Sequence, residues 1–233
     1  MAFVHGKGAA VLWGATDLSA YLNTWDGAAT ADTAEVTVFG ASSKAYIAGT
    51  KDATLSLGGF FDGGTGAVDE VLSAALAGTA AVTLVPAGAG AIGNRAQLAN
   101  VVHTGYTVTA PVADAVSISA EAQVSGGLAG GIVLADLVAR TATGNTTAND
   151  NTASSANGAV AHLHLVAFTG TDITIKVQHS ADNSTWVDLI SFAQLTAVGS
   201  ERKSATGTVN RYLRVNIAGT FTTATLAVAI ARL

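Results

Sequence analysis

Residues 115–124 read Ala115-Val116-Ser117-Ile118-Ser119-Ala120-Glu121-Ala122-Gln123-Val124, with apolar and polar side chains in alternation. On an extended chain Val116, Ile118 and Val124 fall on one face, and the intervening polar side chains fall on the other. Residues 52–57 alternate in the same way. Both segments are therefore predicted to be strands with one apolar and one polar face, and the polar faces carry Asp52, Thr54, Ser56, Ser117, Ser119, Glu121 and Gln123.

The composition of the chain narrows the classes of protein to which it can belong. Of its 233 residues, 49% are hydrophobic and 12% are charged, a charged share of roughly half the usual one. Disorder over the whole length is excluded, because this much apolar material can form a core. A surface so poor in charge is typical of subunits covered by neighbours. The chain has no cysteine, which excludes disulfides and thiolate metal sites.

Charge and hydropathy bear on nucleic-acid and membrane binding. The net charge of −5 argues against sequence-independent clamping of nucleic acid, which needs basic surface. The mean hydropathy is +0.43, yet no apolar run approaches the roughly 18 residues of a spanning helix. The N-terminus lacks the pattern of a secretory signal. We expect no membrane insertion.

One helix and two domains are predicted. Val68, Val71, Leu72, Ala75 and Leu76 have helical spacing and predict a helix at about residues 66–77, with Thr65 as its cap and Gly78 at its end. The glycine-rich residues 126–131 indicate a boundary between a domain at 1–128 and a second domain at 129–233. Up to residue 131 there are four basic and ten acidic side chains, and beyond it seven and six.

The second domain has the pattern of a β-sandwich. Residues 141–158 are rich in Thr, Asn and Ser and predict a polar loop or spacer. Strand-like runs come next at 159–168, 173–179, 186–192, 210–217 and 223–230, with a turn at 180–184. Short strands at this spacing are typical of sandwiches.

No motif in the chain supports enzyme chemistry. Gly88-Ala89-Gly90-Ala91-Ile92-Gly93 matches G-x-G-x-x-G, but residues 98–109 after it have the composition of a strand, not of the helix that a dinucleotide site requires, so we interpret it as a loop. His162 and His164 could chelate a metal, but no third ligand lies near in sequence. We expect them to be surface histidines of the sandwich. No catalytic residue, metal or cofactor is predicted.

Several extended segments carry a resemblance to a known family. They are Asp17–Asn23, Ala31–Gly40, Lys44–Asp62, Gly93–Arg95 and Ala110–Asp114. Over about residues 3–128 this order resembles the tail tube (major tail) proteins of long-tailed, non-contractile bacteriophages. Residues 177–186 and 211–215 resemble the outward-facing extra domain of some of these proteins, and also jelly-roll carbohydrate-binding modules.

The resemblance implies a mainly β fold: an N-terminal tail-tube β-sandwich or barrel with one flanking α-helix, and a C-terminal Ig-like or jelly-roll β-sandwich. It further implies that six copies close a ring and that rings stack into a tube around a tape-measure protein, with tail-tip and terminator proteins as further partners. DNA would pass through without specific binding. The protein would assemble in the host bacterial cytoplasm and reside in the virion.

The resemblance and the strand patterns together give candidate functional residues. We expect the polar faces named above to line the lumen, since basic groups, which would hold phosphates, are missing from them; the alternative is that they face outer solvent. Ring stacking is expected to use residues 40–49 and the N-terminal arm, with the candidates Phe3, Val4, Ser42, Ser43, Lys44 and Tyr46.

A carbohydrate-binding virion protein is the alternative function. Sugar sites need an exposed aromatic ring with hydrogen-bonding neighbours, and in the second domain Trp186 and Tyr212 are the clearest candidates. A weak glycan contact by this domain therefore stays open.

Overall fold

The computed structural model describes residues 5–233, which form a mainly β fold with one α-helix. Among these residues the strands join into one 13-stranded antiparallel network. In chain order the elements are η1 (Gly6–Gly8), β1 (Ala10–Trp13), β2 (Thr16–Asp17), β3 (Leu22–Glu35), β4 (Tyr46–Phe60), α1 (Val68–Ala74), β5 (Thr79–Val85), β6 (Arg95–Thr109), β7 (Ser117–Arg140), β8 (Gly144–Asn145), β9 (Asn149–Asp150), β10 (Ala159–Ser180), β11 (Val187–Ser191), β12 (Gly199–Ala205) and β13 (Tyr212–Arg232).

Two hydrophobic cores lie at the two ends of β7. On one edge of β7, β6 pairs with residues from Ser117 to Ile132; on the other edge, β4 pairs with Ser117–Gln123 and β13 with residues from Ile132 to Arg140. Leu55, Leu72 and Leu84 belong to the first core, whereas Leu163 and Leu226 belong to the second. A third cluster joins them, contributed by strands β1, β5, β6, β7, β10 and β13. The β-sandwich character expected from the alternating segments is thus present at both ends of the fold.

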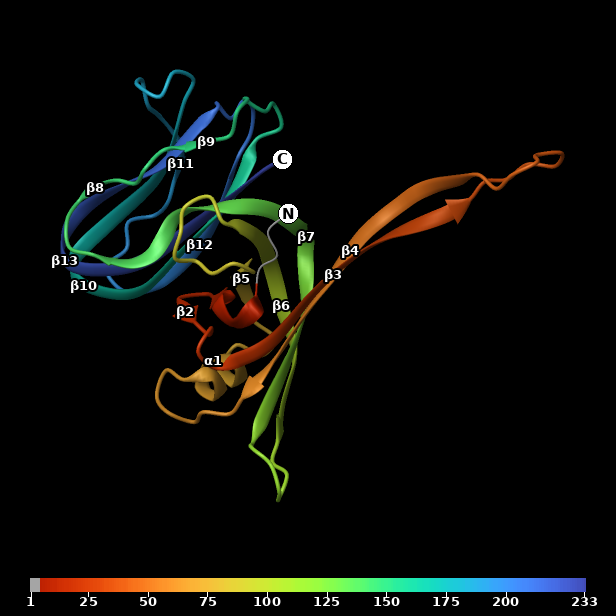
Figure 1. The fold of residues 1–233 in the computed structure, drawn as a ribbon, viewed down its shortest axis with the longest axis horizontal. Helices are drawn as coiled ribbons and strands as arrows, with labels where there is room; N and C mark the ends of the chain where they lie inside the picture. Colours follow the sequence, from red (N-terminus) through yellow and green to blue (C-terminus); the bar gives the residue numbers. More distant parts are fainter. Residues whose placement is uncertain (1–4) are drawn as a thin grey trace.

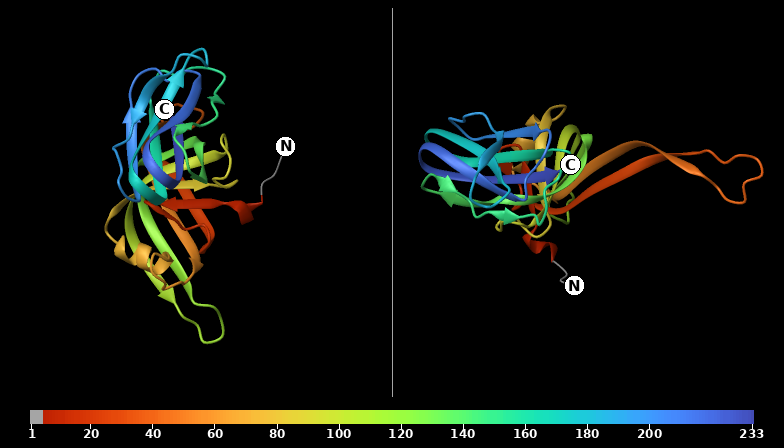
Figure 2. Two further views of the ribbon diagram at one scale, coloured as in Figure 1. Left: turned by 90° about the vertical axis from the view of Figure 1, so that its left-hand side faces the viewer. Right: turned by 90° about the horizontal axis from the view of Figure 1, so that it is seen from above.

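Two hairpins project from this body. The hairpin of β3 and β4 forms a long arm whose tip lies far from the rest of the chain, and the hairpin of β6 and β7 projects in a different direction (Figure 1). The view from above shows the same arm leaving one side of the molecule (Figure 2, right). Residues 28–51 are all exposed, so neither face of the outer arm packs against the body.

The helix is shorter than the sequence pattern predicts. It spans Val68–Ala74, and its N-cap residue is Ala67, which makes no side-chain capping bond. Thr65 as the cap was therefore wrong; instead the carboxylate of Glu70 accepts a hydrogen bond from the N–H of Gly66 at 2.6 Å. The helix ends at Ala74 with Ala75 as its C-cap, and residues 75–77 form a turn in which Ala77 adopts a positive φ of 63°, before the predicted end at Gly78.

The strands of the second domain are longer than predicted. The runs 159–168 and 173–179 form the single strand β10, and 210–217 and 223–230 form the single strand β13. Shifts of register between Leu165 and Asp172 let the two strands stay paired through the polar residues between the runs. The turn after Ser180 is confirmed, and residues 141–158 run along β13 through the short strands β8 and β9.

The glycine-rich residues 126–131 lie inside β7. Leu98 pairs with Ala129 and Asn100 with Ser125, so residues 126–128 bulge out of the ladder with β6. Gly126 and Gly127 have φ values of 80° and 83°, which favour glycine. The division into domains 1–128 and 129–233 stays a prediction, with this bulge at its boundary.

We expect Gly131→Ala to lower the free energy of unfolding while Gly130→Ala leaves it nearly unchanged. A Cβ on Gly131 would lie 2.2 Å from the carbonyl oxygen of Ile230, whereas a Cβ on Gly130 meets nothing within 4 Å. Forcing β7 and β13 apart should cost about 1–3 kcal/mol. Urea unfolding of the two variants measures the difference, and equal stabilities would contradict the close approach.

Candidate functional site

The polar residues predicted to line a lumen share one face of one sheet. Across β4 and β7, Thr54 lies opposite Gln123 and Ser56 lies opposite Glu121. Directly opposed residues point to the same side of a sheet. The residues that alternate with them are buried, namely Ala53, Leu55, Leu57, Ile118, Ala120 and Ala122.

The flanking strands widen this face. On β3, Asp26 lies opposite Ser56, and on β6, Thr107 and Thr109 lie opposite Ser119 and Ser117. We call the face of β3, β4, β7 and β6 that holds these side chains the polar face: Thr24, Asp26, Thr30, Asp52, Thr54, Ser56, Thr107, Thr109, Ser117, Ser119, Glu121 and Gln123. Its members on β3 and β6 were not predicted from the sequence, although the alternation in residues 105–109 was a usable signal.

The polar face carries carboxylates and no basic group. Its charged members are Asp26, Asp52 and Glu121, and Lys51 lies on the opposite face because it alternates with Asp52 along β4. Gln123 ties β7 to β4 by donating to the carboxylate of Asp52 and, at 3.0 Å, to the carbonyl oxygen of Ala53. The polar face is therefore acidic and made mostly of small side chains, and the hydrogen bonds of Gln123 join β7 to β4 on it.

Both outer strands of this four-stranded sheet have a free edge. Among residues 5–233, β3 pairs only with β4. Strand β5 pairs with β6 only as far as Val102, and the carbonyl oxygen of Gly78 accepts from the N–H of His103, so from Thr104 onward β6 pairs with β7 alone. Free edges present unpaired N–H and C=O groups that can pair with another chain.

The predicted stacking residues lie at the end of the arm. Ser42, Ser43 and Lys44 are in the turn between β3 and β4, and Tyr46 opens β4. Lys44 forms an exposed ion pair with Glu35 at 2.9 Å across the hairpin. Apolar side chains at the tip are exposed as well, Phe39 fully and Val38 at 73%. Phe3 and Val4 lie outside the residues that the structure describes.

The aromatic residues of the glycan hypothesis are engaged by arginines. The guanidinium of Arg214 lies 4.1 Å from the ring centre of Trp186, and that of Arg211 lies 4.9 Å from the ring centre of Tyr212. One face of each ring is thus covered. A sugar would have to use the opposite faces.

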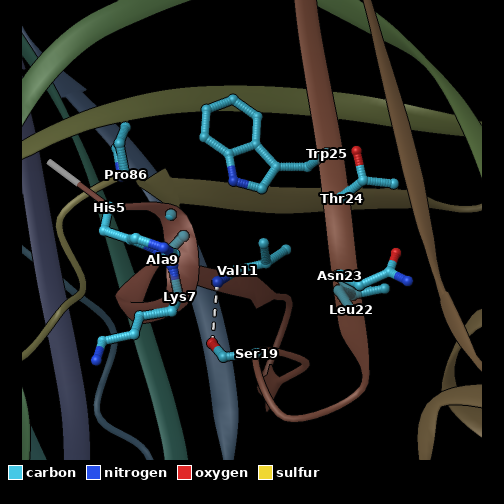
Figure 3. A pocket seen from close by; sticks show the side chains of 11 residues that line it. His5, Lys7, Ala9, Val11, Ser19, Leu22, Asn23, Thr24, Trp25 and Pro86 are labelled. Carbon is cyan, nitrogen blue, oxygen red and sulfur yellow. Dashed lines mark hydrogen bonds between the residues drawn. The ribbon is translucent and has the colours of Figure 1, made fainter.

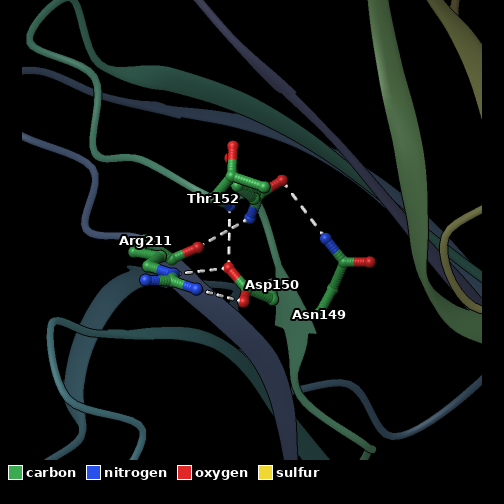
Figure 4. A network of polar contacts seen from close by, with 5 residues as sticks. Asn149, Asp150, Thr152 and Arg211 are labelled. Carbon is green, nitrogen blue, oxygen red and sulfur yellow. Dashed lines mark hydrogen bonds and ion pairs between the residues drawn. The ribbon is translucent and has the colours of Figure 1, made fainter.

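Arg211 also fixes the polar segment 141–158. Its guanidinium donates two hydrogen bonds of 2.6 Å to Asp150, whose carboxylate also accepts from the N–H of Thr152 (Figure 4). The Arg211 bond first, and then that of Thr152, lower the pKa of Asp150 to about 2. This network holds the segment against β13.

His162 and His164 are buried, and the expectation of surface histidines was wrong. Both are 0% exposed and lie where β10 of the second core meets β5 of the first. His164 Nδ1 donates to the carbonyl oxygen of Gly14 at 2.7 Å, so its Nε2 is free to accept from the Thr83 hydroxyl at 2.8 Å. His162 Nδ1 then donates to Thr83 Oγ1 at 3.1 Å.

This buried cluster requires neutral imidazoles. Burial lowers the pKa of His164 to about 4, and burial, His164 and Arg202 hold the pKa of His162 well below its usual value. Protonating His164 Nε2 would remove the acceptor of the Thr83 hydroxyl. Among residues 5–233 no cluster of three or more His, Cys, Asp or Glu side chains could hold a metal.

The G-x-G-x-x-G segment, residues 88–93, is confirmed as a loop between β5 and β6. It packs on β7 through a hydrogen bond from the N–H of Gly93 to the carbonyl oxygen of Val133 at 2.8 Å. No described helix is long and apolar enough to cross a membrane.

Comparisons with known proteins give only distant likenesses. No protein-family model and no curated protein matches the chain. Among solved structures, a chain of the virion of a native gene transfer agent particle is 17% identical with a TM-score of 0.43, covering 54% of this chain and 97% of its own. A chain of the tail of the empty particle, with C6 symmetry, is 15% identical with a TM-score of 0.41 and the same coverage.

A third solved structure covers nearly the whole chain. The Dit protein of phage SPP1, described as a paradigm of the hub adsorption apparatus, is 11% identical with a TM-score of 0.39, covering 96% of this chain and 98% of its own. Likenesses at these scores establish neither the fold nor the function of this chain.

We expect the free energy of unfolding to fall as the pH falls from about 6.5 to about 4. In that window the unfolded chain protonates its histidines, whereas folded His162 and His164 stay neutral. For His164 alone, a pKa of about 4 against 6.5 corresponds to about 3 kcal/mol. Urea unfolding at several pH values measures this, and His162→Gln should flatten the slope while a change at the exposed His5 should not. An equal slope in all three proteins would contradict the buried cluster.

Proposed function

We propose that this chain is a structural subunit of a phage tail tube, in which six copies close a ring around a lumen and rings stack into a conduit for DNA. The observation that carries the proposal is the four-stranded sheet of β3, β4, β7 and β6, which combines an acidic polar face with a free edge on each side. The role is structural and not enzymatic.

The strand directions favour closure between copies. Each neighbouring pair in the order β3, β4, β7, β6 is antiparallel, so β3 and β6 run in opposite directions. If β6 of a second copy adds to β3, the alternation of directions continues unbroken around a ring. Closure then removes every free edge of these sheets, which would otherwise promote aggregation.

The side chains of the polar face suit a passage for DNA. In a ring Asp26, Asp52 and Glu121 would repeat in each copy, and their charges would repel phosphates over a Debye length of about 8 Å. Lysine or arginine at the wall would instead hold DNA through counterion release. A wall of small hydroxyl side chains and carboxylates lets the DNA pass without binding it.

The arm supplies a contact between successive rings. Its length and the exposure of Val38 and Phe39 mean that only another chain can cover its apolar tip. Tape-measure, tail-tip and terminator proteins as partners, and location in the virion after assembly in the host cytoplasm, belong to the same proposal. Because one face of Trp186 and of Tyr212 is occupied, the geometry favours the tube over the glycan-binding alternative.

We expect a disulfide to form between copies when Asp26→Cys is combined with a cysteine at Thr107 or Thr109. Within one copy β4 and β7 separate these positions, which places them about 14 Å apart, and a disulfide spans at most about 7 Å between Cα atoms. The natural chain has no cysteine, so every cross-link reports the engineered pair. Oxidised assemblies should give a ladder ending at six chains on a denaturing gel.

A matched pair with the second cysteine at Ser184, in the turn before β11, serves as the control and should give no ladder. If the β3–β6 pairs stay monomeric while purified wild-type protein forms hollow rods by negative-stain microscopy, ring closure through these edges is wrong.

We expect Ser119→Lys combined with Thr107→Lys to slow DNA delivery while leaving tube assembly intact. The two side chains lie opposite each other on the polar face, so each ring would gain two circles of positive charge that bind phosphates. Particles carrying the variant should eject DNA more slowly, and less so at high salt. The uncharged pair Ser119→Gln and Thr107→Gln is the control, and unchanged ejection by the lysine variant would place this face outside the lumen.

A further inference from the structure

A hollow of about 680 Å³ lies between η1 and the start of β3. Leu22, Trp25, Val11 and Pro86 give it apolar walls, and Lys7 and His5 stand at its rim. Trp25 reaches into it from β3, and the N–H of Val11 is already bonded to Ser19 Oγ at 3.0 Å (Figure 3). This backbone N–H is thus already paired, and the hollow offers apolar contact beside a positive charge.

The turn between β6 and β7 has the matching chemistry. It comprises residues 110–116, and Val112 at its tip is fully exposed, with Val108 at 44% nearby. Asp114 in the same turn is exposed and bonds only the N–H of Ala115 at 2.9 Å. The turn therefore presents an apolar tip next to a negative charge, as the hollow presents an apolar floor next to Lys7.

The strand directions bring these two features together in neighbouring copies. Since β3 and β6 run in opposite directions, β6 of a second copy paired along β3 has its C-terminal end beside the start of β3. Leu22 and Trp25 open β3, and the β6–β7 turn comes directly after Thr109. Within one copy the turn and the hollow stand at opposite edges of the same sheet, so a chain cannot place this turn in its own hollow.

We infer that the hollow receives the β6–β7 turn of a second copy of this chain, with Val112 against Trp25 and Leu22 and with Asp114 facing Lys7. The inference rests on the proposed ring closure. It adds a contact that determines which copies pair and in which register β6 of one copy pairs with β3 of the next. A β-edge alone specifies register weakly, because its backbone groups repeat along the strand. A side-chain anchor at one end removes that freedom.

The test combines cross-linking with a charge exchange. Val112→Cys with Asn23→Cys should form a disulfide between copies, whereas Phe39→Cys with Asn23→Cys, which tests the arm tip as the occupant, should not. Lys7→Glu and Asp114→Lys should each reduce ring formation, and the double variant should restore it. Val112→Ser, in an exposed turn that the fold does not need, should raise the protein concentration at which rings form by about tenfold.

The outcomes separate this inference from the proposed function. If Asp26 cross-links to Thr107 and rings form, but the Val112 pair stays reduced and the charge variants assemble normally, the inference is overturned and ring closure stands. A disulfide from Phe39 in place of Val112 would also overturn it. If neither β3–β6 pair cross-links and no rings form, both fail.

Discussion

Pairing along the 24 residues of β7 is the constraint that sets the arrangement of the molecule. Its first residues are held between β4 and β6, pairing with β6 continues to Ile132, and β13 holds the rest. One continuous backbone thus fixes the polar sheet and the second core relative to each other. The bulge at residues 126–128, where two glycines adopt positive φ, lies between two stretches that both pair with β6, so this ladder continues past the bulge while the other edge of β7 passes from β4 to β13.

The same constraint explains why the first sheet keeps two free edges. Strand β5 pairs with β6 only to Val102 and then gives way to the loop after α1, so the outer part of β6 has no second partner among the described residues. Strand β3 ends the sheet on the other side, because β1 and β2 pair with β5 and with each other and not with it. A protein that stayed a monomer would gain from covering or charging these edges. Here neither β3 nor β6 contains lysine, and both contain several threonine and alanine residues and a glycine.

Part of the arrangement of strands and helix could be predicted from the sequence. Alternation predicted the strands around residues 52–57 and 116–124, because one face of each packs on a core and the other does not. Helical spacing predicted α1, but its length was overestimated because Ala75 and Leu76 continue the apolar pattern past the point where the helix ends, and Ala77 then turns left-handed. Local patterns could not show that β10 and β13 continue through polar stretches, since register shifts between the two strands decide that.

The burial of His162 and His164 could not be predicted from the local sequence pattern either. Their partners Thr83 and Gly14 are 79 and 150 residues away in sequence from the histidines they bond, and only the packing of β10 against β5 brings them together. On the polar face the pattern identified β4 and β7 but not β3, because glycine and alanine weaken the alternation there, whereas on β6 the alternation of residues 105–109 was present but was not used.

Sparse charge and abundant small side chains therefore have one physical explanation in this fold. Lysine at the edges of β3 and β6 would oppose the approach of a second strand, and lysine on the polar face would hold phosphate. Two charged groups beside those edges, Lys7 at the hollow and Asp114 at the β6–β7 turn, have opposite signs and stand at opposite edges of the sheet. In a ring, rotation brings opposite edges of neighbouring copies together, so Lys7 of one copy and Asp114 of the next would attract each other. A twofold axis would instead bring like edges and like charges together. The charge pattern thus favours a head-to-tail ring over a symmetric dimer.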